Sequence, residues 1–129
     1  MYYKAVPMLL VDDVDEALAW YQEKLDAELQ YTLPQVPPYE WVSILLDNVE
    51  IMLARKEAAR GWYSDQVNTC EEPCNVAVYI FVGSVDTLHE QLKDSVAVVM
   101  KPKDQSYGLR EFAIKDPFGF VLVFGGNIE

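Results

Sequence analysis

Two segments of this sequence share one pattern: AVPMLLVDDVDEALAWY at residues 5–21 and VAVYIFVGSVDTLHEQL at residues 76–92. They lie 71 positions apart. Each begins with an apolar run that is typical of a buried strand and continues with apolar residues at helical spacing. Asp13, followed by Glu16, and Ser84 are suited to cap the two helices. Each segment therefore predicts a strand followed by a helix, and Pro7 favours an edge position for the first strand.

The sequence after each helix predicts three further strands. The expected strands are residues 28–32, 41–46 and 49–54 in the first copy, and 96–100, 110–115 and 120–124 in the second. Residues 33–38 and 101–107 are expected to be loops. At the same offset of 71, Glu40-Trp41 falls on Glu111-Phe112. We therefore predict an α+β fold of two βαβββ modules that form curved mixed sheets around a cleft.

These modules are expected to form a single domain over residues 1–129. Module 1 spans about residues 1–57 and module 2 about residues 75–129. The polar linker between them, about residues 58–74, has room for one helical turn.

The composition limits the classes of partner. The chain has 21 acidic and 10 basic residues and a net charge of −11, which disfavours nucleic acid. The acidic side chains would attract a cationic small molecule if they lined a cleft, or they could serve solubility alone. No apolar run approaches the roughly 20 residues of a membrane helix, and no signal-peptide pattern opens the chain. We expect a cytoplasmic protein without a membrane partner.

Few residues are suited to metal binding or nucleophilic catalysis. Cys70 and Cys74 form a lone C-x3-C, a weak metal signal, and are expected to be free thiols. His89 is the only histidine and falls on the surface of a predicted helix. Without a histidine base for Ser or Cys, we expect no catalytic triad or Cys-His dyad.

Several motifs resemble the vicinal oxygen chelate superfamily, which includes glyoxalase I, extradiol dioxygenases, and fosfomycin- and bleomycin-resistance proteins. The opening AVPMLLVDDVDEALAWY and the ending REFAIKDPFGFVLVF, residues 110–124, carry the resemblance. Ala5-Val6-Pro7 and the Asp116–Gly119 motif are most similar to bleomycin-resistance proteins. The resemblance implies the duplicated fold and a homodimer with clefts between subunits.

Enzymes of that superfamily hold a divalent metal with one side chain from each of four strands. The resemblance places these positions at Val6, Met52, Ala77 and Val123. None of the four is a good ligand for a divalent metal. Glu50 is expected to point to the opposite face of the sheet. We therefore expect no metal cofactor and no catalytic residue, and leave open an enzyme with a relocated metal site.

The predicted cleft has apolar and aromatic walls. Strand alternation places Tyr79 and Phe81 on the same face of the sheet as the four metal-ligand positions. Met8 and Met52 from the first module join them on that face. The methionines could line a pocket or fill a packed core, whereas the Tyr79 hydroxyl favours a pocket because it needs a partner. The resemblance implies that Tyr107 stacks on a flat ligand, although Leu109 is an extra residue after it. Trp62 and Tyr63 could cover the cavity or anchor a loop.

Glu40 and Glu111 look like duplicated carboxylates. They could pair with each other across the pseudo-twofold axis, or each could make a structural contact, Glu111 with Arg110. Glu111 is also a candidate to give the cleft its acidic character.

Three functions follow from these features. The first is a metal-independent protein that sequesters a flat, cationic small molecule, as bleomycin-resistance proteins do in antibiotic resistance. The second is a metal-dependent lyase or dioxygenase with a relocated site. The third is a binding or regulatory module for another metabolite.

Overall fold

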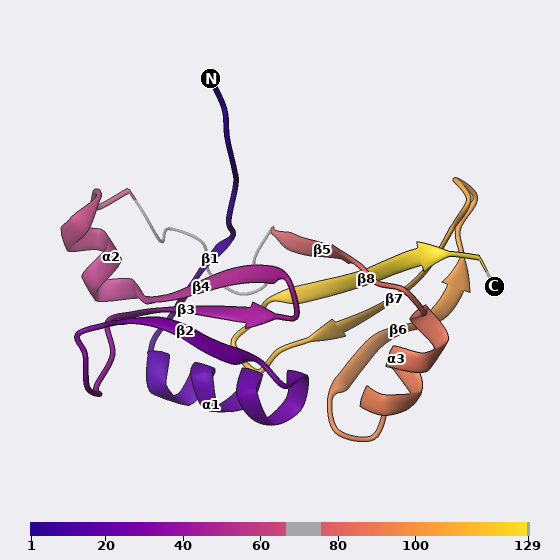
Figure 1. The fold of residues 1–129 in the computed structure, drawn as a ribbon, viewed down its shortest axis with the longest axis horizontal. Coiled ribbons are helices and arrows are strands. Elements are labelled where there is room, and N and C mark those ends of the chain that lie inside the picture. Colours follow the sequence, from indigo (N-terminus) through magenta and orange to yellow (C-terminus); the bar gives the residue numbers. More distant parts are fainter. Residues whose placement is uncertain (67–75, 129) are drawn as a thin grey trace. The chain divides into compact units, whose positions relative to one another are not determined.

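A computed structural model describes residues 1–66 and 76–128 and divides the chain into two compact units, Met1–Glu71 and Glu72–Glu129. Each unit carries one four-stranded mixed sheet, as predicted for an α+β fold with two modules (Figure 1). The first unit contains β1 (Met8–Val11), α1 (Val14–Leu25), β2 (Glu28–Leu33), β3 (Trp41–Leu46), β4 (Val49–Arg55) and α2 (Lys56–Trp62). The second contains β5 (Ala77–Phe81), α3 (Val85–Leu92), β6 (Ala97–Asp104), β7 (Leu109–Lys115) and β8 (Val121–Asn127).

In unit 1 the strands follow the order β1-β4-β3-β2, so β1 lies at an edge, as Pro7 predicts. The β1 and β4 strands are parallel, and the other neighbours are antiparallel. Regular pairing begins at Met8 rather than Ala5, because Pro7 has no N–H to donate. Its carbonyl still accepts a hydrogen bond from the Met52 N–H at 2.9 Å.

Helix α1 covers one face of this sheet. Its predicted cap is confirmed, since the Asp13 carboxylate accepts a hydrogen bond from the Glu16 N–H at 3.0 Å. The helix buries Val14, Ala17, Leu18 and Tyr21. The strand residues buried with them are Leu9, Val11, Val42, Ile44, Ile51 and Leu53. The core of unit 1 therefore lies between α1 and one face of the sheet.

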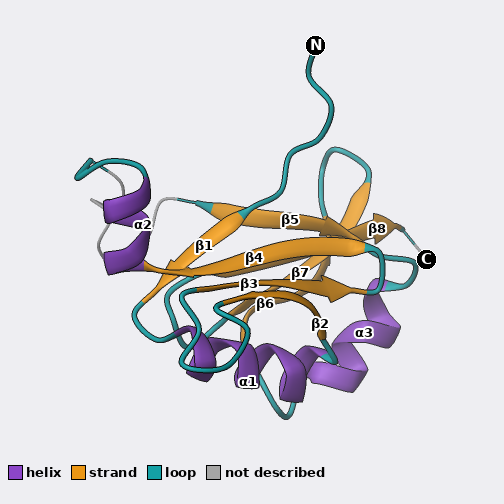
Figure 2. Cartoon of the chain, turned by 60° about the vertical axis from the view of Figure 1, so that its left-hand side comes forward, coloured by secondary structure: helices purple, strands orange, loops and turns teal. Residues whose placement is uncertain are grey.

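Unit 2 repeats this arrangement in the strand order β5-β8-β7-β6, with α3 against the sheet (Figure 2). Ser84 caps α3 by accepting a hydrogen bond from the Thr87 N–H at 3.2 Å. Phe112 and Phe124 stack in the core with ring centroids 5.1 Å apart. His89 lies half-buried on α3, where its ring meets Phe112 edge-on at 5.3 Å, so it contacts the core.

Two segments contain more regular structure than predicted. Helix α2 occupies residues 56–62 and extends the single turn that was expected there. Strand β6 continues to Asp104, so the predicted loop at 101–107 is wrong over its first half. Lys103 and Asp104 pair with β7, and Pro102 is accommodated because β6 is an edge strand whose register shifts between Met100 and Lys103. None of the helices in the described residues is long and apolar enough to span a membrane.

The strand registers correct the overlay of the two modules. Met8 faces Met52 and Tyr79 faces Val123, so the offset of 71 holds for β1, β4 and their copies. On the third strand the offset is 70, because Leu45 faces Glu50 whereas Lys115 faces Val121. The segment 116–120 is one residue longer than its counterpart 46–49. Glu111 therefore corresponds to Trp41, and the predicted equivalence of Glu40 and Glu111 is wrong.

Candidate ligand-binding site

The face of the second sheet opposite α3 carries an exposed aromatic surface. Alternation along β5 buries Val78 and Ile80 and leaves Tyr79 and Phe81 on the other side. Tyr79 is 41% exposed and Phe81 is 71% exposed, and their rings lie 5.0 Å apart with an interplanar angle of 57°. We call this side of the sheet the open face of unit 2. It is also formed by residues Ala77, Lys103, Glu111, Ala113, Lys115, Val121, Val123 and Gly125.

Tyr79 reaches across β8 to a carboxylate on β7. It pairs with Val123, whereas Glu111 pairs with Gly125, so the tyrosine must pass over the glycine to reach the glutamate. A Cβ at Gly125 would overlap the Tyr79 hydroxyl and would lie 2.6 Å from its Cζ. The Tyr79 hydroxyl donates to Glu111 Oε2 at 2.6 Å. Gly125 therefore makes the cross-strand contact possible.

Tyr107 approaches the same carboxylate from the turn between β6 and β7. Gly108 has a φ of +93°, a conformation that favours glycine, and its N–H donates to the Gln105 carbonyl at 3.1 Å. This tight turn brings the Tyr107 hydroxyl within 2.7 Å of Glu111 Oε1, to which it donates. Tyr107 remains 65% exposed while Glu111 is only 3% exposed. Two exposed tyrosines thus cover one buried carboxylate.

Hydrogen bonds from its neighbours determine the ionisation of the Glu111 carboxyl. Burial raises the pKa of the Glu111 carboxyl, but side-chain hydrogen bonds from Tyr79, Tyr107 and Gln105 together hold it below its ordinary value. In return, the hydrogen bond to Glu111 raises the pKa of Tyr79 to about 12 and also raises the pKa of Tyr107. At neutral pH the cluster consists of a carboxylate and two neutral phenols.

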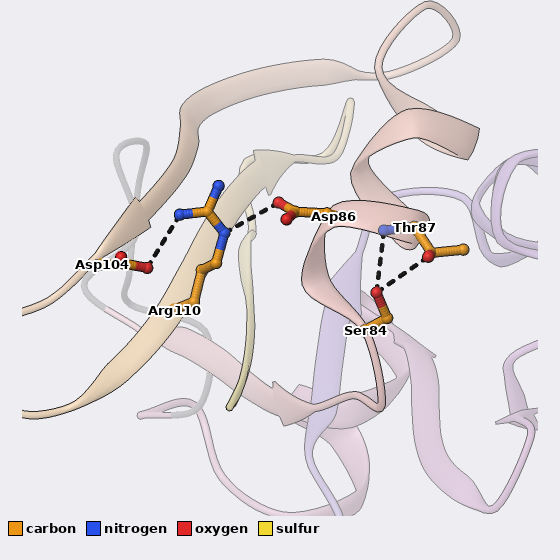
Figure 3. Close-up of polar contacts among 5 residues, drawn as sticks. All are labelled: Ser84, Asp86, Thr87, Asp104 and Arg110. Carbon is orange, nitrogen blue, oxygen red and sulfur yellow. Dashed lines mark hydrogen bonds and ion pairs between the residues drawn. The ribbon is translucent and has the colours of Figure 1, made fainter. Parts of the chain in front are cut away.

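Arg110 does not pair with Glu111, which contradicts that prediction. Adjacent residues of a strand point to opposite faces, and the guanidinium of Arg110 lies between two aspartates (Figure 3). Its Nε donates to Asp86 at 3.0 Å and its Nη1 donates to Asp104 at 2.9 Å. Arg110 therefore ties β7 to α3 and β6 and leaves the negative charge of Glu111 uncompensated by it.

Val14-Asp15 and Val85-Asp86 lie 71 positions apart in the sequence, and the two aspartates make similar contacts. Asp86 follows the Ser84 cap and binds Arg110. In unit 1, Asp15 accepts a hydrogen bond from the Tyr39 N–H at 3.1 Å. Each contact joins the first turn of a helix to the region where the third strand of its module begins. Tyr39 precedes β3, and Arg110 lies near the start of β7.

A polar cluster lies on the corresponding open face of unit 1, the side of that sheet opposite α1. Glu50 Oε2 lies 2.7 Å from the Ser43 hydroxyl, which is also 3.1 Å from Gln30 Oε1. Glu50 Oε1 accepts an ion-paired hydrogen bond from Lys4 Nζ at 2.7 Å. The predicted position of Glu50 is therefore wrong: it lies two residues from Met52 and shares its face. Lys4 first and Ser43 second lower the pKa of Glu50.

The four positions that the resemblance assigns to a metal do not carry side chains suited to one. Met52 and Val123 lie in β4 and β8, Ala77 begins β5, and Val6 precedes β1. Three of these side chains have no donor atom and the fourth offers a soft thioether. Among residues 1–66 and 76–128, no three His, Cys, Asp or Glu side chains form a group that could hold a metal ion. Cys70 and Cys74 lie outside the described residues.

The structure brings together four of the seven predicted ligand residues. Tyr79, Phe81 and Glu111 lie on the open face of unit 2, and Tyr107 reaches Glu111 from the turn before β7. Met8 and Met52 face each other across β1 and β4 in unit 1. Trp62 ends α2 and packs edge-on against Tyr63 at 6.2 Å. Glu40 makes a bidentate contact with Arg55, with its oxygens 2.8 Å from Nε and 3.2 Å from Nη2.

Sequence reasoning missed Ser43 and Gly125. Ser43 stands alone among the apolar residues of WVSILL, residues 41–46, which marks a buried polar group in need of a partner. Gly125 and Gly126 interrupt an otherwise apolar strand, which is typical of a close approach by another group.

The comparisons with known proteins agree with this architecture. Residues 5–124 match the model of the Glyoxalase/Bleomycin resistance protein/Dioxygenase superfamily, and the chain belongs to that superfamily, as the motifs predicted. No curated protein sequence matches the chain.

Three solved structures illustrate the range of similar folds. A glyoxalase/bleomycin resistance protein/dioxygenase from Nocardioides is 17% identical with a TM-score of 0.79, covering 100% of this chain and 87% of that one. The bleomycin-binding protein of Streptomyces verticillus, complexed with copper(II)-bleomycin, is 20% identical with a TM-score of 0.66 and covers 100% and 98%. The fosfomycin resistance protein FosX of Listeria monocytogenes is 16% identical with a TM-score of 0.69 and covers 99% and 95%. At these identities the likeness concerns the fold.

Proposed function

We propose that this protein is a metal-independent binding protein that sequesters a flat, cationic small molecule on the open face of unit 2. The observation that carries the proposal is the pair of exposed tyrosines, Tyr79 and Tyr107, whose hydroxyls cover the buried carboxylate of Glu111. Exposed aromatic rings offer a stacking surface, and the carboxylate at their hydroxyl ends favours a positive ligand. The neighbouring Phe81 ring extends the surface.

The chemistry of the superfamily's metal positions supports metal independence. Val6, Met52, Ala77 and Val123 offer no carboxylate or imidazole. Elemental analysis of purified protein tests this part of the proposal. Stoichiometric zinc, nickel, manganese or iron would contradict it and would favour a metal-dependent lyase or dioxygenase.

Calorimetry with bleomycin tests ligand binding directly, because a structure of similar fold holds copper(II)-bleomycin. We expect both metal-free and copper-loaded bleomycin to bind, with the metal-free affinity unchanged by a chelator. Phe81→Ala should weaken binding, whereas Tyr31→Ala, at an exposed tyrosine on β2 of unit 1, should not. Absence of binding at several hundred micromolar would sink the bleomycin-specific form of the proposal.

The homodimer, the cytoplasmic location and a role in antibiotic resistance belong to the same proposal. They rest on membership of the superfamily. Light scattering on the purified protein tests the dimer, and growth of bacteria in bleomycin with and without the expressed chain tests resistance.

A further inference from the structure

Both carboxylate oxygens of Glu111 already accept a hydrogen bond from a neutral donor. Oε2 accepts from Tyr79 at 2.6 Å and Oε1 accepts from Tyr107 at 2.7 Å, distances typical of strong hydrogen bonds to a charged group. With only 3% of the residue exposed, little of the carboxylate can be reached from solvent. A ligand ammonium therefore cannot form a direct ion pair with Glu111 unless it displaces a tyrosine.

The charge of Glu111 nevertheless remains. Among residues 1–66 and 76–128, no side chain forms an ion pair with Glu111. Arg110 is held by Asp86 and Asp104. Lys103, which faces Glu111 across β6 and β7, is exposed to solvent and is not within ion-pair distance of it. Phenol hydroxyls satisfy hydrogen bonds without supplying a positive charge. A buried negative charge therefore lies at the hydroxyl ends of the Tyr79 and Tyr107 rings.

This arrangement strengthens the cation–π attraction of the Tyr79 and Tyr107 rings. A phenol that donates to a carboxylate gains electron density on its ring, and a ring face attracts cations placed within about 6 Å of its centroid. Tyr79 and Phe81 form a tilted pair of such faces, 5.0 Å apart. A cation can thus interact with the charge of Glu111 through the rings rather than by contact with its oxygens.

We infer that the open face of unit 2 selects a cation without N–H donors, a quaternary ammonium or an N-alkylated heteroaromatic ring, over a primary ammonium of similar size. This inference rests on the proposed function and specifies its ligand class. A primary ammonium carries three donors and is strongly hydrated, so it loses water and gains only the phenol oxygens of Tyr79 and Tyr107 as acceptors here. A quaternary cation has no donors to satisfy and needs only the ring faces.

Three flat probes of similar size test the selection by calorimetry at pH 8. They are N-methylquinolinium, which is a non-donor cation, neutral quinoline, and 1-naphthylmethylammonium, which is a primary ammonium. We expect N-methylquinolinium to bind about two- to thirtyfold more tightly than either of the others. Equal affinities for the two cations would overturn the inference and leave the proposed function standing, whereas absence of binding by all three would overturn both.

Two variants separate the local charge from the acidity of the whole chain. Glu111→Gln should abolish the preference for N-methylquinolinium and retain quinoline binding. Glu28→Gln makes the same change in net charge at an exposed position on β2 and should leave the preference intact. An equal loss in both variants would assign the preference to the overall charge of −11 and overturn the inference.

Tyr79→Phe removes the hydrogen bond to Glu111 Oε2 and keeps the aromatic ring. The variant frees Glu111 Oε2, so the relative affinity for 1-naphthylmethylammonium should rise at least severalfold. An unchanged ratio between the two cations would contradict the inference. This variant keeps the test valid if Glu111→Gln does not fold.

Discussion

Substitution of Gly125 by alanine should break the central contact of the candidate site. Gly125 lies on β8 between the strand that carries Tyr79 and the strand that carries Glu111. An added Cβ would lie 2.6 Å from Tyr79 Cζ and 2.9 Å from its Cε1, so the ring must move. Tyr79 can turn toward solvent, and it then loses its hydrogen bond to Glu111.

The expected cost follows from that hydrogen bond. A hydrogen bond to a charged group contributes about 1.5–3 kcal/mol, and water that reaches Glu111 after the ring moves keeps the loss toward the lower end. Gly125 does not have a left-handed φ, so alanine also stabilises the protein by about 0.4–1 kcal/mol through the unfolded state. The free energy of unfolding should therefore fall by about 1 kcal/mol.

Urea denaturation at pH 7 measures this change, and a double-mutant cycle assigns it to Tyr79. In a Tyr79→Ala background the same Gly125→Ala substitution should be neutral or slightly stabilising. Gly83→Ala, a glycine with open space around it, serves as the matched control and should also be neutral or stabilising. The reasoning is refuted if Gly125→Ala costs as much without the Tyr79 ring as with it.

Three further predictions concern the helix caps and the ionisation of the site. Asp13→Ala and Ser84→Ala should each lower the free energy of unfolding by about 1 kcal/mol, whereas Asp13→Ser should be nearly neutral in the same urea assay. In alkali, one tyrosine should titrate near pH 12 in ultraviolet absorbance and disappear in Tyr79→Phe; since its folded pKa is raised, its contribution to stability should be lost between about pH 10 and 12. In acid, the lowered folded pKa of Glu111 means that its contribution is present above the unfolded value near 4.5 and is lost below it. The stability difference between wild type and Glu111→Gln should accordingly shrink from pH 7 to pH 3, and a constant difference would contradict this assignment.

The sequence predicted those elements whose causes are local. The caps at Asp13 and Ser84 each require one side chain and one turn of helix, and both form as expected. The strand at 41–46 has its predicted bounds because the two-residue turn at Asp47-Asn48 closes the hairpin. Elements that depend on a neighbouring strand were predicted less well, as the extension of β6 to Asp104 illustrates.

Register was the main limit on predicting the candidate site. A single offset of 71 aligned the beginning and the end of the modules, but the extra residue at 116–120 shifts the third strand by one. A shift of one residue moves a side chain to the other face of a sheet, so Glu111 had to be compared with Trp41 rather than Glu40. The contact between Tyr79 and Glu111 also crosses β8. The glycine at position 125 is the one sequence feature that could have indicated this close approach.

The two open faces have diverged in how they satisfy a carboxylate. Glu50 in unit 1 is paired with Lys4 at 2.7 Å, so its charge is neutralised within the chain. Glu111 in unit 2 is held by two phenols, which satisfy its oxygens but leave its charge. A cationic ligand would have to displace Lys4 to reach Glu50, whereas it needs only the ring faces to interact with Glu111. The charge balance therefore favours unit 2 as the ligand-binding module, although both units derive from the same βαβββ pattern.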